Sequence, residues 1–372
     1  MVMNNPIKQT PLNALHRELG ARMVEFAGYE MPVQYPSGIR QEHEHTRTLA
    51  GLFDISHMGQ IQISGEQAPV MLETVVPGDI TGLGTGQQLY TLFTNDNGGT
   101  IDDLMVTNLE GDLFLVVNAA CKEKDLSLLQ SVIDRSCRIE YYTDRALLAL
   151  QGPRASSVLG NMNPAINELG FMQGGAFIVA DIDCIINRCG YTGEDGFEIS
   201  VASDKAEQLA RMLLQYDDVA AVGLGARDSL RLEAGLCLYG HELDETISPV
   251  EAGLSWVVAA KYRGKNPVAA RFPGAERILV QLQQGAASIR TGIKPEGKMP
   301  VRDGVELLHA SGEVVGRITS GGFGATVNGP VAMAYVNAEY AVPETELHVN
   351  IRGRNHTVYT AALPFVKHRY HK

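Results

Sequence analysis

The chain has 372 residues, of which 45% are hydrophobic and 20% are charged, with a formal net charge of −12. This composition describes a globular protein of two or three domains. The acidic balance argues against general binding to nucleic acid or to an anionic membrane. No apolar run is long enough to span a bilayer, and the first residues resemble neither a secretory signal nor an Arg-rich transit peptide.

Five scattered cysteines indicate a reducing compartment rather than a disulfide framework: Cys121, Cys137, Cys184, Cys189 and Cys237. We therefore expect a cytoplasmic protein, or a processed one in the mitochondrial matrix. No Cys or His pair stands at the spacing of metal ligands, so no metal is predicted.

The first half of the chain mixes helix and strand patterns. Thr10-Pro11 predicts a helix start, and Gly20 predicts its end. Residues 23–35 are expected to be irregular because they are interrupted by Gly and Pro, and a helix is expected over 38–49 with Glu42 among its outward residues. Further helices are predicted over 66–75, 122–133, 206–214 and 225–235, and from 153. Strands are predicted over 60–63, 88–94, 100–107, 112–118 and 146–150, with 176–186 and 196–201 as a long strand pair.

Two adjacent acids lie within one of these strands. Asn97-Gly98 predicts a hairpin turn, and the strand that follows contains Asp102 and Asp103. Because neighbours on a strand point to opposite faces, Asp102 shares the apolar face of Leu104, whereas Asp103 lies on a mixed face typical of a pocket wall. The sequence therefore favours Asp103 as the acid of a cavity. A solvated hairpin with one acid capping its turn is the alternative.

Composition changes over residues 261–274, where Gly, Pro and basic residues gather. We place a domain boundary there, dividing the chain into 1–274 and 275–372. Short Gly-punctuated strands follow, at 278–283, 306–308, 314–319, 331–335 and 348–351. Their pattern predicts a small β-barrel or sandwich.

Five motifs occur together in a fixed order: Phe53-Asp-Ile-Ser-His-Met-Gly59, Gly98-Gly-Thr-Ile-Asp-Asp-Leu-Met-Val106, Gly190-Tyr-Thr-Gly-Glu-Asp-Gly-Phe-Glu198, Gly223-Leu-Gly-Ala-Arg-Asp228 and Gly316-Arg-Ile-Thr-Ser-Gly-Gly322. With them the chain resembles the T-protein family of the glycine cleavage system, the tetrahydrofolate-dependent aminomethyltransferases. The resemblance implies an α+β fold of three domains arranged like a cloverleaf. Residues 1–274 would form two interleaved α+β subdomains that bind folate, and 275–372 a C-terminal barrel of jelly-roll-like form.

The resemblance also implies the reaction. The substrate would be an aminomethyl group on the lipoyl arm of a separate carrier, the H-protein. Tetrahydrofolate would accept its carbon as a co-substrate, giving 5,10-methylenetetrahydrofolate, ammonia and the dihydrolipoyl carrier. The second acid of the family's Asp-Asp pair corresponds to Asp103, which we expect to stabilise the positively charged carbon.

Six further residues match family positions near the folate: Asn118, Tyr191, Glu198, Arg227, Arg369 and Tyr370. Glu198 would accept the N–H groups of a pterin ring, and Arg227 starts a helix, where an anion nearby would offset the unfavourable macrodipole. Each position has a simpler alternative, such as an exposed strand acid for Glu198 or a pairing of Arg227 with Asp228. The two tail residues are alternatives for one contact. We expect His57 to line the pocket rather than to act as a base, and Glu194 to form a turn.

Two other functions remain open from the sequence. One is a folate-dependent demethylase of a methylated amine or sulfonium compound, and the other is a non-catalytic folate-binding factor of iron–sulfur assembly. For the aminomethyltransferase, we expect the carrier to dock on a basic patch, to which residues 261–265 could contribute.

Overall fold

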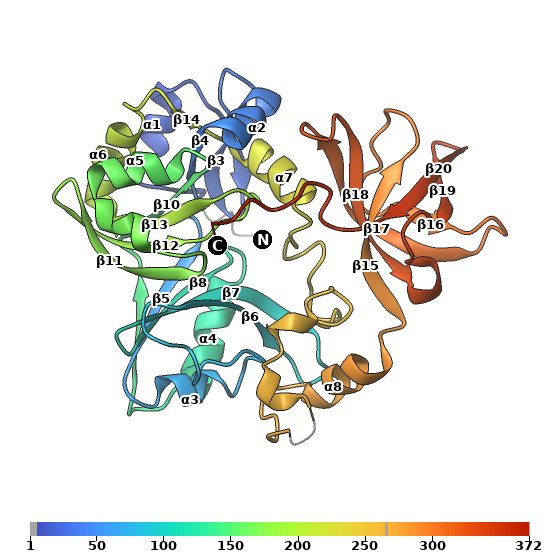
Figure 1. Cartoon of the computed structure of the whole chain (residues 1–372), viewed down its shortest axis with the longest axis horizontal. Helices are drawn as coiled ribbons and strands as arrows, with labels where there is room; N and C mark the ends of the chain where they lie inside the picture. The colour runs from blue at the N-terminus through green and yellow to red at the C-terminus, as the bar shows by residue number, and fades with distance from the viewer. Residues whose placement is uncertain (1–5, 265–266, 372) are drawn as a thin grey trace.

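The computed structural model describes residues 6–264 and 267–371, which form three lobes around a common centre (Figure 1). The first lobe contains a six-stranded sheet in the order β11-β12-β13-β10-β4-β14. These strands are β4 (Ala50–Asp54), β10 (Arg145–Gln151), β11 (Gln173–Val179), β12 (Ile182–Arg188), β13 (Gly196–Ala202) and β14 (Val219–Ala221). Among residues 6–233, the helices outside the second lobe are α1 (Asn13–Glu18), α2 (Ile39–Thr48), α5 (Ala155–Met162), η1 (Pro164–Glu168), α6 (Ser203–Leu213) and α7 (Leu224–Glu233).

The second lobe is a five-stranded sheet in the order β6-β7-β8-β5-β9. Its strands are β5 (Gly59–Ser64), β6 (Gln88–Thr94), β7 (Thr100–Leu109), β8 (Asp112–Val117) and β9 (Arg138–Tyr142), with helices α3 (Ala68–Leu72) and α4 (Lys122–Val132). All of these elements lie between β4 and β10 in the chain, yet β4 and β10 are paired antiparallel. The chain therefore leaves the first sheet, builds the second, and returns.

Alternation along the strands explains how the two sheets share a core. On β10, Ala146, Leu148 and Leu150 face a cluster with α5 and α6, whereas Leu147 and Ala149 face a second cluster that also contains residues of β8. Strands that bury both faces need apolar residues at every position, and β10 has them from Ala146 to Leu150.

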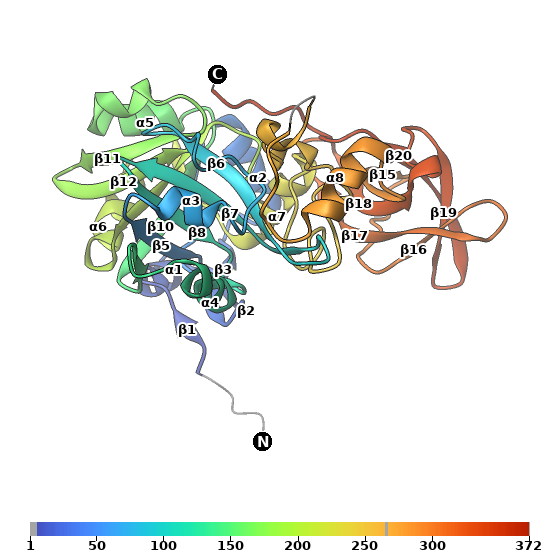
Figure 2. The ribbon, with the colours of Figure 1, turned by 90° about the horizontal axis from the view of Figure 1, so that it is seen from below.

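The third lobe is a closed barrel in the order β15-β18-β17-β16-β19-β20. Its strands are β15 (Ser288–Pro295), β16 (Glu306–Leu308), β17 (Val314–Gly324), β18 (Gly329–Asn337), β19 (Glu346–Ile351) and β20 (Arg354–Ala361), with η4 (Ala338–Tyr340) before β19. Figures 1 and 2 both place the barrel at one end of the molecule, and α7 packs against β17 and β18. The predicted α+β fold with a C-terminal barrel is confirmed.

Several predicted elements were wrong. Residues 23–35 form β2 (Arg22–Phe26) and β3 (Tyr29–Gln34), which join β1 (Lys8–Gln9) in a small sheet. Pro32 is accommodated beside a register shift in this pairing. The long strand over 176–186 is instead a hairpin that turns at Ala180 and Asp181, both with positive φ.

Residues 278–283, predicted as a strand, belong to α8 (Ala275–Gln284). Its apolar residues pack on a cluster around Leu92 and Tyr262. Two short helices precede α8 in the chain: η2 (Ser255–Val257) and η3 (Ala260–Tyr262). Glu42, predicted to face solvent, is buried and accepts hydrogen bonds from the backbone N–H groups of Tyr35 and Gly223. Within the described residues, no helix is long and apolar enough to cross a membrane.

Candidate active site

A cavity of about 840 Å³ lies where the three lobes meet. Its wall is predominantly apolar, with a small number of charged groups, which is typical of a site for a small organic ligand. All three lobes and the C-terminal tail contribute to it, through residues such as Asp103 of β7, Arg227 of α7, Arg290 of β15 and Tyr370 of the tail.

Asp103 lies in this wall, on the face of β7 that alternation predicts. Two neutral donors hold its carboxylate: the Tyr90 hydroxyl at 3.1 Å from Oδ2 and Asn118 Nδ2 at 2.7 Å from Oδ1. Burial, and then the charge of Asp102, raise the pKa of Asp103 to about 7. A carboxyl that titrates near neutral pH is suited both to stabilise a cation and to move a proton.

Behind Asp103 lie two more buried acids, and we call Asp102, Asp103 and Asp125 the aspartate cluster. Asp102 accepts hydrogen bonds from both the backbone N–H and Nδ2 of Asn118, each at 3.0 Å. Asp125 is fully buried and faces Asp102, and neither of its oxygens has a donor among the described residues. Burial, and then Asp102, raise the pKa of Asp125 to about 10. Asp125 therefore keeps its proton at neutral pH and shares it with Asp102.

Another part of the wall carries two opposite charges, Glu198 and Arg227. Glu198, on β13, is buried, which raises its pKa. Arg227 stands over the ring of Tyr191, with its guanidinium carbon 4.7 Å from the centroid, and its buried Nη1 has no partner within the described residues. Buried polar groups are normally hydrogen-bonded, so this pair fits a ligand with both N–H donors and an acceptor.

Two of the predicted residues take part in the wall in different ways. Asn118 lines the cavity and bridges Asp102 to Asp103. Tyr191 lines it too, and its hydroxyl donates to the carbonyl of Cys237.

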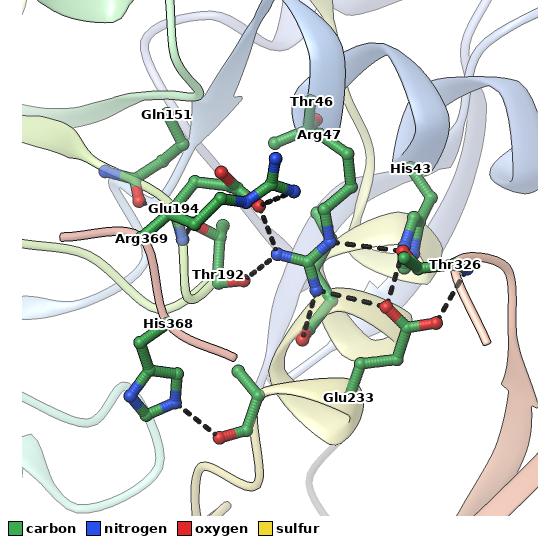
Figure 3. Close-up of polar contacts among 12 residues, drawn as sticks. His43, Thr46, Arg47, Gln151, Thr192, Glu194, Glu233, Thr326, His368 and Arg369 are labelled. Carbon is green, nitrogen blue, oxygen red and sulfur yellow. Dashed lines mark hydrogen bonds and ion pairs between the residues drawn. The ribbon is translucent and has the colours of Figure 1, made fainter. Parts of the chain in front are cut away.

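The two tail candidates, Arg369 and Tyr370, have different surroundings. Tyr370 lines the cavity and stacks on Phe171, with the ring centroids 4.2 Å apart. The Arg369 side chain instead forms an ion pair with Glu194 at 2.7 Å (Figure 3), and Arg369 is absent from the cavity wall as the described residues form it.

His57 lies in the wall as expected. Burial lowers its pKa to about 4, so that the imidazole is neutral at pH 7. Its Nδ1 has no hydrogen-bond partner among the residues that the structure describes.

Several wall residues were not predicted from the sequence, notably Tyr90, Trp256, Phe171 and His368. Tyr90 could have been found, because it pairs with Met105 across the predicted hairpin and thus shares the face of Asp103. Trp256 has no such signal: it comes from η2, far along the chain, and lies 5.5 Å from the Tyr90 ring.

The described residues offer no metal site, and one lysine of the predicted basic segment is paired with acids. Over residues 6–264 and 267–371, no group of three or more His, Cys, Asp or Glu side chains could hold a metal ion. Lys261, predicted to help bind the carrier, is paired with Glu73 and Asp79 at 2.6 Å each. Lys265 of the same segment lies outside the described residues.

Comparison with known proteins gives consistent matches over nearly the whole chain. The family model for the GCVT N-terminal domain matches residues 12–262, and that for the glycine cleavage T-protein C-terminal barrel domain matches 290–367. The mitochondrial aminomethyltransferase of Dictyostelium discoideum is 42% identical over 387 residues, covering 99% of this chain and 95% of that protein. The human mitochondrial aminomethyltransferase is 42% identical over 374 residues, covering 98% and 91%.

A solved structure matches equally well. The crystal structure of the glycine cleavage system aminomethyltransferase T from Bartonella henselae superposes with a TM-score of 0.92 at 43% identity. The match covers 98% of this chain and all of that one (100%).

Proposed function

This chain belongs to the glycine cleavage T-protein family and is an aminomethyltransferase of the glycine cleavage system, and from this premise we propose that it passes the one-carbon group to tetrahydrofolate in the central cavity, with Asp103 as the catalytic residue. The family is folate-dependent. The observation that carries the proposal is the acid itself: Asp103 faces a largely apolar cavity, held by two neutral donors, with a pKa of about 7.

The cavity fits the proposed co-substrate. Glu198 would accept the N–H donors along the edge of the pterin, and Arg227 would donate to an acceptor of the same ligand through its free Nη1. Asn118, Tyr191 and Tyr370 would complete the wall around it. Tetrahydrofolate, when bound, supplies the two amine nitrogens, N5 and N10, that accept the carbon.

Asp103 would act on the charge of the substrate carbon. That carbon becomes cation-like while its old bond breaks, and a carboxylate in a water-poor cavity stabilises such a charge strongly. Tyr90 keeps its hydroxyl proton, because burial and then Asp103 raise its pKa, and therefore always donates to Asp103. With Asn118 it fixes the direction of the carboxylate, so that no reorientation is needed during transfer.

Proton movement would use the same side chain. Near pH 7 the Asp103 carboxyl is populated in both protonation states, so it could take a proton from one amine and return it to another. Asp125 would hold its own proton throughout and thereby limit the negative charge behind Asp103.

We further propose that the aminomethyl group arrives on the lipoyl arm of the H-protein, a separate acidic carrier. Docking through basic side chains near the cavity mouth would make the association sensitive to salt. Salt-independent association would argue against it. The cytoplasm, or the mitochondrial matrix given the relatives named mitochondrial, is the proposed location.

The test is to measure ammonia release from aminomethylated lipoyl carrier with and without tetrahydrofolate. We expect release that depends on both. Folate binding without turnover would contradict the proposal, and so would faster turnover of a methylated amine or sulfonium compound. The identity to aminomethyltransferases favours the first outcome over both alternatives.

A further inference from the structure

The C-terminal tail, residues 362–371, crosses from the barrel to the first lobe (Figure 1). Backbone hydrogen bonds attach it there: Val366 N–H to the Glu233 carbonyl (3.0 Å), Arg369 N–H to the Gly193 carbonyl (2.8 Å) and Phe171 N–H to the His371 carbonyl (3.3 Å). Each such bond contributes little net stability, because water replaces it when it breaks. Side chains must therefore decide how firmly the tail is held.

Consecutive tail side chains point in different directions. His368 and Tyr370 line the cavity, and His368 Nε2 lies 2.8 Å from the Ala234 carbonyl oxygen. Arg369 between them points away, toward Glu194 (Figure 3). The tail thus carries part of the cavity wall on one side and an ionic anchor on the other.

Glu194 joins this anchor to the first lobe. It is 1% exposed; its Oε1 forms an ion pair with Arg369 Nη2 at 2.7 Å and accepts a hydrogen bond from Arg47 Nη1 of α2 at 2.8 Å. Figure 3 shows both guanidinium groups reaching the same carboxylate. Arg369 itself is half exposed, so it can leave without disturbing the buried pair of Arg47 and Glu194.

The contacts continue to the barrel. Arg47 also pairs with Glu233 at 3.1 Å, and Glu233 Oε1 accepts the backbone N–H of Thr326, between β17 and β18, at 2.8 Å. We call Arg47, Glu194, Glu233 and Arg369, with His43 and Thr326, the arginine network. It connects α2, α7, the barrel and the tail, the same parts that enclose the cavity.

We propose that Glu194 is a positioning residue for the folate site: by holding Arg369 it fixes the tail, so that His368 and Tyr370 close one side of the cavity around the ligand. The identity of the ligand rests on the proposed function, whereas the anchoring of the tail does not. Arg369 acts through Glu194 and touches no ligand.

The experiment compares Glu194→Gln, Arg369→Ala, Arg369→Lys and the double variant Glu194→Gln/Arg369→Ala. Arg211→Ala is the matched control, because Arg211 forms an exposed ion pair with Glu18 and Glu207 outside the cavity wall. Calorimetry gives the Kd for tetrahydrofolate, and the rate of carboxypeptidase digestion reports release of the tail.

We expect Glu194→Gln and Arg369→Ala each to weaken tetrahydrofolate binding about tenfold, the typical worth of one charge-assisted hydrogen bond. Both should speed digestion of the tail, and the double variant should match Glu194→Gln, because Arg369 acts only through Glu194. Arg369→Lys should restore most of the affinity, and Arg211→Ala should change neither readout.

Three results would overturn the inference: unchanged affinity with a released tail, weaker binding with a tail as protected as in the wild type, or additive effects in the double variant. The second would make Arg369 a direct ligand contact. If Glu194→Gln failed to fold, the Arg369 variants would still decide. A wild-type protein that binds no tetrahydrofolate would instead contradict the proposed function, while digestion would still test the anchor.

Discussion

Two groups of buried acids, the aspartate cluster and the arginine network, are treated in opposite ways by the same fold. The donors to the aspartate cluster are neutral: a phenol, a side-chain amide and a backbone N–H. The acids of the arginine network face guanidinium groups at 2.7–3.1 Å. Burial raises the pKa of Asp103 to about 7, whereas at Glu233 burial is outweighed by His43, and the pKa falls to about 2.

The difference shows how one fold can use buried acids for proton transfer in one place and for structural stability in another. A buried carboxylate with a cation beside it stays charged and fixed, and it is costly to disturb. One with only neutral donors keeps a proton that can move. The predictions below ask whether the two groups can be separated by experiment.

The largest effect should come from breaking the arginine network. Arg47→Met leaves Glu194 and Glu233 with fewer partners, and we expect a loss of about 3–5 kcal/mol in the free energy of unfolding, measured by urea denaturation. Arg40→Met is the control, since Arg40 forms an exposed pair with Glu44 on the same helix. It should cost less than about 1 kcal/mol, and equal losses would contradict the comparison.

Next is the loss of the catalytic charge. Asp103→Asn keeps the shape of the side chain but cannot stabilise a cation, so kcat should fall by about 10²–10³. The Kd for tetrahydrofolate should stay within about threefold, because Glu198 and Arg227 carry that binding. Single-turnover kinetics and calorimetry measure the two quantities, and a fully active variant would remove Asp103 from the mechanism.

At Glu198 and Arg227, substitutions should affect the binding of tetrahydrofolate more than the rate of transfer. Glu198→Ala and Arg227→Ala each remove a charged hydrogen-bond partner, so the Kd for tetrahydrofolate should rise about tenfold or more. The single-turnover rate at saturating folate should change less. Unchanged Kd values in calorimetry would exclude both residues from the site.

The two groups should also respond oppositely to pH. Activity that needs ionised Asp103 should fall about tenfold per unit below pH 7, and this acid limb should be absent in Asp103→Asn. For stability, the raised pKa means that the contribution of Asp103 is present at low pH and lost as the pH rises through about 7. Asp103→Asn should thus be about 1–2 kcal/mol more stable than the wild type at pH 8, nearly equal to it at pH 2.5, and intermediate at pH 5.

Glu233 has the opposite sign, because its pKa is lowered to about 2. Its contribution is present above the unfolded value near pH 4 and is lost as the pH falls toward 2. Urea denaturation at pH 2.5, 5 and 8 measures both trends. If the free energy of unfolding of the wild type rose steadily from pH 2.5 to pH 8, the predicted loss of stability from ionisation of Asp103 would be contradicted.

The smallest effect concerns Asp125. An amide donates as a protonated carboxyl does, so Asp125→Asn should keep kcat within about twofold, whereas Asp125→Ala removes the donor to Asp102 and should lower kcat by about tenfold. The acid limb of the pH–rate profile separates the two variants from a general loss of packing. If Asp125→Asn lost as much activity as Asp125→Ala, the buried acid would be charged rather than protonated.

The role of Asp103 in the aspartate cluster was predicted from the sequence, whereas the arginine network was not. Alternation on a strand is a local rule, and it identifies Asp103 as the acid of the pocket face from the sequence alone. The partners of Glu194 are 147 and 175 positions away, at Arg47 and Arg369. A turn residue whose role depends on such distant contacts carries no local pattern, and so Glu194 was predicted only as a turn former.

The errors in the elements have similar causes. The run over 278–283 is apolar enough for a strand, but its period fits a helix, and only packing against Leu92 and Tyr262 resolves the choice. Glu42 was predicted to face solvent because the N–H groups that donate to its buried carboxylate, those of Tyr35 and Gly223, come from distant parts of the chain.

The return of the chain to its first sheet constrains the order of folding. Every strand pairing of the second sheet lies within residues 59–142. In contrast, β4 can pair with β10 only after the chain between them, about ninety residues, has been brought back to it. Closing a long loop delays such pairing. The inserted sheet is therefore free to become an early cooperative unit, and amide exchange should report it as a foldon distinct from the sheet that surrounds it.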